Sequence, residues 1–146
     1  MRTLSLLLRW LHVVAAITWM GGMLFLALVL VPVTRRIEDR ALRARLFHEV
    51  GLRFRAVGWI ALGVLVATGI GNLWLAPELL TASRFQWKLS LVVLALALAA
   101  VHDFDLGPRA GEPGADPSVR VRASWLARVN LVVVLVIVLL GLSLLR

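Results

Sequence analysis

The sequence contains no cysteine, and this absence excludes disulfide bonds, thiolate metal sites and cysteine nucleophiles. Methionine is scarce, with three residues in the chain, which counts against a tight Cu(I) site built from thioethers. The apolar segments also lack serine nucleophile arrangements, phosphate-binding loops and paired carboxylates. No catalytic residue is therefore predicted.

Acidic residues are also few, with 8 Asp and Glu against 16 Lys and Arg, so the formal net charge is +8. In a soluble protein this excess would indicate a nucleic-acid partner. Here the arginines gather between long apolar runs, where membrane topology places them. We therefore predict no nucleic-acid partner.

Hydrophobic residues make up 61% of the chain, whereas soluble domains have about 45–50%. The mean hydropathy is +0.92. Both values predict an integral membrane protein whose surroundings are the lipid bilayer. Four apolar runs each approach the roughly 20 helical residues that cross a bilayer. They cover residues 4–33, 57–76, 85–104 and 125–145.

Short connections between these runs favour an all-α fold, an antiparallel four-helix bundle that forms a single domain over residues 1–146. The first run is longer than the h-region of a secretory signal peptide, which has about 7–15 residues, so it is predicted to remain as a span. No internal repeat stands out.

The distribution of basic residues predicts the orientation of the bundle. Eleven of the 16 lie in the first and third loops or at the start of the fourth run, and five lie towards the other side. The positive-inside rule then places those loops in the cytoplasm and both termini outside the plasma membrane.

The first loop contains a regular apolar pattern, with Leu42, Leu46, Val50 and Phe54 repeating every four residues among arginines. This pattern indicates a helix with one apolar stripe over residues 38–55. It is either an interfacial helix or a cytoplasmic extension of the second span. In the third loop, Pro108, Pro113 and Pro117 are predicted to end the third helix and keep the loop non-helical.

The first run carries His12, and a histidine inside a membrane span is a functional candidate by default. The alternative is a structural histidine that is hydrogen-bonded to a neighbouring helix. Helical geometry places small residues and Trp19 on the same face as His12, so that a neighbouring helix or a flat ligand can approach closely.

Two methionines in the same run, Met20 and Met23, form an i,i+3 pair beside two glycines. Thioethers are soft ligands that select Cu(I), but the same residues also serve as ordinary core packing. His12 and Met23 cannot bind one ion from a straight helix, because about 16 Å separates them along its axis.

Two polar clusters are predicted at different depths. In the outer third, His12 is expected to converge with Asn72 of the second run and Lys88 of the third. The alternative for Lys88 is that its side chain extends to the lipid headgroups. At the inner end, His102 and Asp103 reach a level similar to that of Asn130. This inner cluster would bind a metal or relay protons, or the helix end would pair with Arg109 or Arg128.

Three stretches carry a resemblance to a known family. They are WLHVVAAITWMGGMLF, RFRAVGWIALGVLVATGIGNLW and RFQWKLSLVVLALAL, which resemble the first three helices of CopD-type copper resistance proteins. The resemblance covers nearly the whole chain. It implies a four-helix module of copper import, export or tolerance, with His12, Met20 and Met23 on the path of the metal.

The chain also resembles the HemJ-type protoporphyrinogen oxidases, which are small four-helix proteins that bind haem b. The matching points are His12, Lys88 and the stretch WLARVN at the start of the fourth run. The resemblance implies that His12 and Lys88 form the functional pair. The sequence departs from that family after its first helix, where VLVPVTRR replaces an arginine-containing motif that ends in histidine.

The primary hypothesis from the sequence is therefore copper handling of the CopD type without a chemical step. The alternative is a haem-b redox protein in which His12 is an axial ligand and Lys88 neutralises a propionate. A third interpretation is a non-catalytic membrane subunit or assembly factor. In each case the chain is expected to contact a membrane partner or a second copy of itself.

Overall fold

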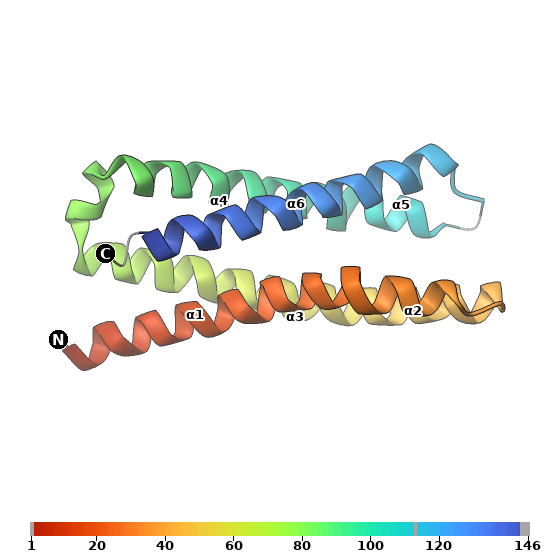
Figure 1. The fold of residues 1–146 in the computed structure, drawn as a ribbon, viewed down its shortest axis with the longest axis horizontal. Coiled ribbons are helices and arrows are strands. Elements are labelled where there is room, and N and C mark those ends of the chain that lie inside the picture. Colours follow the sequence, from red (N-terminus) through yellow and green to blue (C-terminus); the bar gives the residue numbers. More distant parts are fainter. Residues whose placement is uncertain (1, 113, 144–146) are drawn as a thin grey trace. The chain divides into compact units, whose positions relative to one another are not determined.

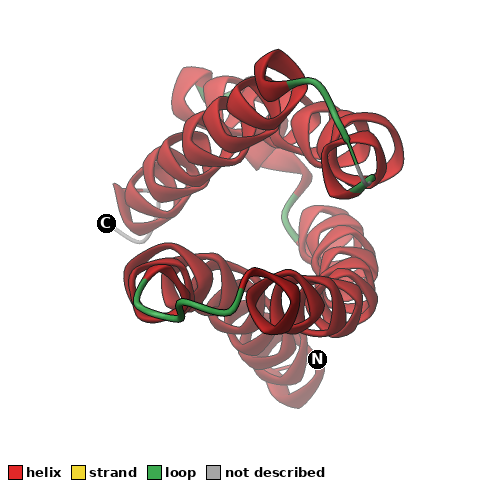
Figure 2. Cartoon of the chain, turned by 90° about the vertical axis from the view of Figure 1, so that its right-hand side faces the viewer, coloured by secondary structure: helices red, strands yellow, loops and turns green. Residues whose placement is uncertain are grey.

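The computed structural model describes residues 2–112 and 114–143, and every regular element within these ranges is helical. Four helical runs are long and apolar enough to cross a membrane. They are Arg2–Arg35, Arg40–Leu75, Ser83–Gly111 and Pro117–Ser143. The predicted all-α fold with four spans is confirmed, and Figure 2 shows helices joined by short loops.

The chain divides into two compact units, Met1–Leu79 and Leu80–Arg146, and each is described by itself. The elements of the first unit are α1 (Arg2–Phe25), the π-helical turn η1 (Leu26–Leu30), α2 (Val31–Arg35) and α3 (Arg40–Leu75). A short 3₁₀ helix, η2 (Pro77–Thr81), follows. The second unit continues with α4 (Ser83–Val101), the π-helical turn η3 (His102–Leu106), α5 (Gly107–Gly111) and α6 (Pro117–Ser143).

In the first unit α1 packs along α3 in the opposite direction (Figure 1). Leu8 lies against Gly71, with its Cδ1 3.2 Å from the place of a Cβ on that glycine. Further along α1, Trp19 lies against Gly58. Residue numbers therefore rise in α1 as they fall in α3. Glycines on α3 let the two backbones approach closely, as small residues do in membrane helix pairs.

One contact in this seam reverses the roles of the two helices, because here the glycine is on α1. Gly22 faces the ring of Phe54, and a Cβ at position 22 would overlap that ring. The adjacent Gly21 has open space around the place of its Cβ. The two neighbouring glycines therefore differ sharply in the room that they leave for a side chain.

In the second unit α4 packs along α6, also in the opposite direction (Figure 1). Lys88 near the start of α4 lies against Gly141 near the end of α6, with Nζ 3.5 Å from the place of a Cβ on the glycine. Arg84 donates a hydrogen bond of 3.5 Å to the carbonyl oxygen of Ser143. Small or β-branched residues fill the seam, namely Ala95, Ala99, Ala123 and Val134. Packing of these two antiparallel pairs into one bundle stays a prediction.

The two units repeat the same order of elements, which no sequence pattern indicated. In each, a long helix runs through a five-residue π-helical turn into a five-residue α-helix whose second residue is proline, Pro32 or Pro108. The π-helical turns are closed by the N–H groups of Val31 and Gly107, which donate to the carbonyl oxygens five residues earlier. The second long helix then begins after an aspartate, Asp39 or Asp116.

These aspartates accept hydrogen bonds from backbone N–H groups at the helix starts. Asp39 Oδ1 accepts from Ala41 at 2.8 Å and from Leu42 at 3.2 Å, and Asp116 Oδ1 accepts from Ser118 at 2.8 Å. Such caps satisfy donors that a helix start leaves without an intrahelical partner. The bond from the Ser118 backbone also holds the pKa of Asp116 below its ordinary value.

The prediction that Pro108 ends the third helix was wrong. Pro108 is the second residue of α5, and the helical run continues to Gly111. Proline is tolerated there because the preceding turn is π-helical and the missing N–H falls at the start of the next helix. Pro117 is the first residue of α6 instead of a loop residue, and Pro113 lies outside the described residues.

The amphipathic segment 38–55 is not a separate interfacial helix. Of the two alternatives, the structure shows the extension, because α3 runs without interruption from Arg40 to Leu75. Its 36 residues correspond to about 54 Å, well beyond the roughly 30 Å of a hydrocarbon core. The arginine-rich start of α3 therefore continues past the membrane.

Exposed tryptophans mark one end of the first helix pair. Trp10 near the start of α1 is 59% exposed, and Trp74 near the end of α3 is 88% exposed. Tryptophan is enriched where membrane helices meet the lipid headgroups. Because α1 and α3 are antiparallel, both tryptophans lie at the same end of the pair, which fits a membrane interface at that level.

Candidate metal site

The candidate site starts from His12, which lies half-buried in the seam between α1 and α3. Its Nδ1 is 2.9 Å from Thr68 Oγ1. Its Cε1 lies 3.6 Å from the place of a Cβ on Gly69. The absence of a side chain at Gly69 thus lets the imidazole lie close to the α3 backbone, and Thr68 fixes the orientation of the ring.

The other hydrogen bond of Thr68 shows which atom carries the proton in its contact with His12. The Thr68 hydroxyl has a single proton, and Oγ1 lies 2.6 Å from the carbonyl oxygen of Val64, to which it donates. Oγ1 must therefore accept from His12, so the Nδ1 atom of His12 carries a proton. A neutral imidazole protonated at Nδ1 presents the lone pair of Nε2, which is the usual arrangement of a metal-binding histidine.

His12 and Trp19 both lie against glycines of α3, namely Gly69 and Gly58. Ala15 and Trp19 are buried, with 6% and 8% of their surface exposed. Met20 and Met23 are half-buried on the same helix. Met23 remains about 16 Å from His12 along the axis, so the two do not share an ion. A role of either methionine in copper binding stays a prediction.

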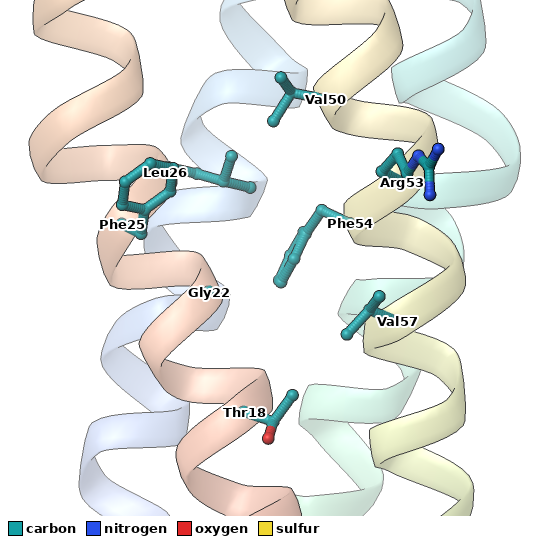
Figure 3. Close-up of a pocket in the computed structure, with 8 residues that line it drawn as sticks. All are labelled: Thr18, Gly22, Phe25, Leu26, Val50, Arg53, Phe54 and Val57. Atoms are coloured by element: carbon teal, nitrogen blue, oxygen red, sulfur yellow. The ribbon is translucent and has the colours of Figure 1, made fainter.

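A hollow of about 230 Å³ lies in the first unit, but it is not at His12 (Figure 3). It opens beside the contact between Gly22 and Phe54, and its lining is almost entirely apolar. Arg53 is the only charged residue among those that line it. None of the lining residues is a histidine, methionine or acid, so the hollow is a space for hydrocarbon rather than for a metal.

The residues of the predicted outer cluster lie in both units. Asn72 is half-buried on α3, one turn beyond Thr68, and belongs to the same unit as His12. Lys88 belongs to the second unit, where it is half-buried against Gly141. His12 and Lys88 occupy matching positions in the repeated plan, because each lies 20 residues before the proline of its unit. Their convergence with Asn72 stays a prediction.

At the inner end, the structure joins two of the three predicted residues. His102 Nδ1 lies 2.8 Å from Asp103 Oδ1. Asn130 is 5% exposed, and its Oδ1 has no hydrogen-bond partner among the described residues. No group of three histidine, cysteine, aspartate or glutamate residues that would hold a metal occurs within the described ranges.

The pairing expected between this helix end and Arg109 is present, through Asp105. Arg109 pairs with Asp105 at 3.0 Å. The guanidinium of Arg128 stacks over the ring of Trp125, 5.5 Å from its centroid.

Thr68 is the partner of His12 that the sequence analysis did not single out. Its spacing of four residues from Asn72 shows a shared helical face. Only the pairing of α1 with α3 reveals that this face meets His12.

The fold and this site define a class, namely a multi-pass helical membrane protein with a histidine held inside a helix seam by a hydroxyl group. The family model of copper resistance protein D, CopD, matches residues 48–144, and the chain therefore belongs to the CopD family. The match includes α4, α6 and most of α3. His12, Met20 and Met23 lie before it.

A relative with a similar sequence is an uncharacterized protein from Aquifex aeolicus (strain VF5). It is 35% identical over 136 residues, which cover 92% of this chain and 91% of the relative. This share is large enough that the similarity reaches into α1. No solved structure matches this chain.

Proposed function

We propose that this protein handles copper as a transport or tolerance protein, with the metal bound or passed at His12. The observation that carries this proposal is the 2.9 Å bond between His12 Nδ1 and Thr68. It directs the Nε2 lone pair away from Thr68, and imidazole nitrogen is a good copper ligand. Membership of the CopD family supports the choice of copper.

A site with a single imidazole suits passage of the metal better than storage. The chain has no cysteine, and its few methionines do not complete a coordination sphere around His12. Permeation requires binding that is strong enough for entry and weak enough for release. A site of modest affinity in the outer half of the spans meets both requirements.

The proposed orientation follows from the arginines at the start of α3. These residues extend beyond the hydrocarbon core, where the positive-inside rule places them in the cytoplasm. His12 and Thr68 then lie in the outer half of the membrane, because Thr68 is about 10 Å from the opposite end of α3. Both chain termini are outside the plasma membrane in this arrangement.

Copper binding to the full-length protein in lipid nanodiscs tests the proposal. Cu(I) is titrated against a coloured competing chelator, and an absorption spectrum is recorded on the same sample. We expect His12→Gln to remove one equivalent of copper. His48→Gln is the matched control, because His48 is exposed on the cytoplasmic part of α3, and it should bind as the wild type does.

Two results would replace the copper proposal. A Soret band that disappears in His12→Gln would establish the haem-b alternative, with His12 as an axial ligand. If neither copper nor haem binds and His12→Gln only lowers the unfolding temperature, His12 is structural. The protein would then be a non-catalytic membrane subunit or assembly factor.

A further inference from the structure

The hollow between α1 and α3 is a space for hydrocarbon that the proposed copper function does not use (Figure 3). Thr18, the one hydroxyl residue in its lining, donates its proton to the carbonyl oxygen of Val14 at 2.9 Å. An apolar cavity of about 150 Å³ stays dry and takes up apolar molecules, and this hollow is larger, at about 230 Å³. Its lining therefore suits a hydrocarbon chain.

The hollow is open to the surroundings of the helix pair. Phe25 and Val57 line it from the two helices and are 52% and 47% exposed. In Figure 3 the Val57 side chain points into the space between the helices. On α1 the hollow lies where the α-helix ends at Phe25 and the π-helical turn η1 begins at Leu26. Such turns are frequent at functional sites. A chain that lies alongside the protein can thus enter from the lipid.

The hollow lies at one boundary of the hydrocarbon core. Trp74 near the end of α3 marks the opposite interface. Arg53 precedes Trp74 by 21 residues, or about 32 Å along the helix, and the core is roughly 30 Å thick. Val57 lies one turn nearer to the middle of the core. One end of the hollow is therefore level with the lipid phosphates, and the rest reaches into the region of the acyl chains.

Arg53 supplies the positive charge beside this apolar space. It is exposed, and its guanidinium lies to the side of the hollow (Figure 3). It has no ion-pair partner within residues 2–112 and 114–143, because the acid one turn before it, Glu49, pairs with Arg45 at 2.8 Å. A guanidinium group binds phosphate through two parallel hydrogen bonds. Arg53 is thus available to a phosphate at its own depth.

We propose that the hollow binds an anionic phospholipid of the cytoplasmic leaflet, with an acyl chain in the hollow and the phosphate on Arg53. A zwitterionic lipid carries an ammonium group that Arg53 repels, so a lipid with net negative charge is favoured. The choice of leaflet follows from the orientation proposed above. Binding itself requires neither that orientation nor copper.

Native mass spectrometry of the full-length protein in detergent tests the charged part of the site. The protein is titrated with phosphatidylglycerol or with phosphatidylcholine of the same acyl chains. The wild type should retain one phosphatidylglycerol more tightly than phosphatidylcholine. Arg53→Gln should lower the affinity for phosphatidylglycerol by about fivefold and leave that for phosphatidylcholine unchanged.

Arg40→Gln is the matched control for Arg53→Gln. It removes the same charge from an exposed position at the start of α3, about 20 Å from Arg53 along the helix. This variant should retain phosphatidylglycerol as the wild type does.

Val57→Phe tests the apolar part of the site. The added ring fills the hollow while Arg53 stays in place, so retention of phosphatidylglycerol should fall to the level of phosphatidylcholine. Val66→Phe adds the same ring at an exposed position of α3 outside the lining and should bind as the wild type does. Glycerol phosphate, which has no acyl chains, should not displace the retained lipid.

The outcomes separate a lipid from other occupants of the hollow. Equal retention of both lipids by the wild type, or wild-type retention in Arg53→Gln, overturns the site. Wild-type retention in Val57→Phe together with a lower unfolding temperature shows that protein side chains fill the hollow instead. If Val57→Phe does not fold, Arg53→Gln decides. No copper is added, so failure of the titration at His12 and failure of lipid binding are distinguishable.

Discussion

Replacing Thr68 by valine is expected to weaken copper binding at His12 by about 10- to 100-fold. Valine has nearly the same shape as threonine, so the α1–α3 seam stays filled. Its methyl group cannot accept the Nδ1 proton of His12, which lies 2.9 Å from the hydroxyl oxygen in the wild type. The ring then loses both its orientation and its preferred tautomer. Competition titration with Cu(I) in nanodiscs measures the change.

Thr18→Val is the matched control for Thr68→Val. Thr18 donates its hydroxyl proton to the carbonyl oxygen of Val14 at 2.9 Å, as Thr68 does to Val64, but it is exposed. The control should retain wild-type affinity. Equal affinity in both valine variants would show that Thr68 does not position the histidine.

A methyl group at Gly22 is expected to destabilise the first unit by about 1–3 kcal/mol. The Cβ of Gly22→Ala would overlap the Phe54 ring, so the ring must rotate or the two helices must separate. Either movement also disturbs the hollow beside this contact (Figure 3). Thermal unfolding of the full-length protein, followed by circular dichroism in nanodiscs, gives the difference.

Gly21→Ala separates this steric effect from that of removing a glycine. The place of its Cβ has no atom within 4 Å, so alanine fits without strain. Alanine also favours helix by up to about 1 kcal/mol over glycine. The unfolding temperature of Gly21→Ala should therefore equal or exceed that of the wild type. A loss equal to that of Gly22→Ala would contradict a specific contact with Phe54.

Most of the fold was predictable because membrane spans leave a strong signal in composition. The uncharged stretch around His12 and the arginines that follow it fixed the first span and its boundary. The repeat of apolar residues every four positions likewise predicted the helix that carries Leu42 and Phe54. It did not decide between a separate interfacial helix and an extension of α3, because both have the same apolar pattern.

The π-helical turns could not be predicted from composition or from the spacing of apolar residues. Proline usually predicts the end of a helix, and for that reason Pro108 was assigned to a helix end. The chain instead inserts a five-residue π-helical turn ahead of Pro32 and another ahead of Pro108, closed by the N–H groups of Val31 and Gly107. The local composition does not distinguish a π-helical turn that precedes a proline from the end of a helix. The sequence analysis therefore also missed that the two units have the same order of elements.

The sequence singled out His12 as a candidate but did not predict its contacts. His12 stood out because a histidine inside a span is costly. Its partner Thr68 depends on how α1 and α3 are aligned, and a sequence fixes that alignment only through many small packing contacts. The orphaned oxygen of Asn130 likewise becomes visible only when its helix is packed against α4.

Nitrogen NMR of the protein with ¹⁵N-labelled histidine tests most directly whether His12 binds copper through Nε2. The three histidines are assigned with the His12→Gln, His48→Gln and His102→Gln variants. Upon addition of diamagnetic Cu(I), the Nε2 resonance of His12 should shift while Nδ1 keeps its proton. An unchanged Nε2 resonance of His12 in the presence of bound copper, or loss of the proton from Nδ1, would contradict this site.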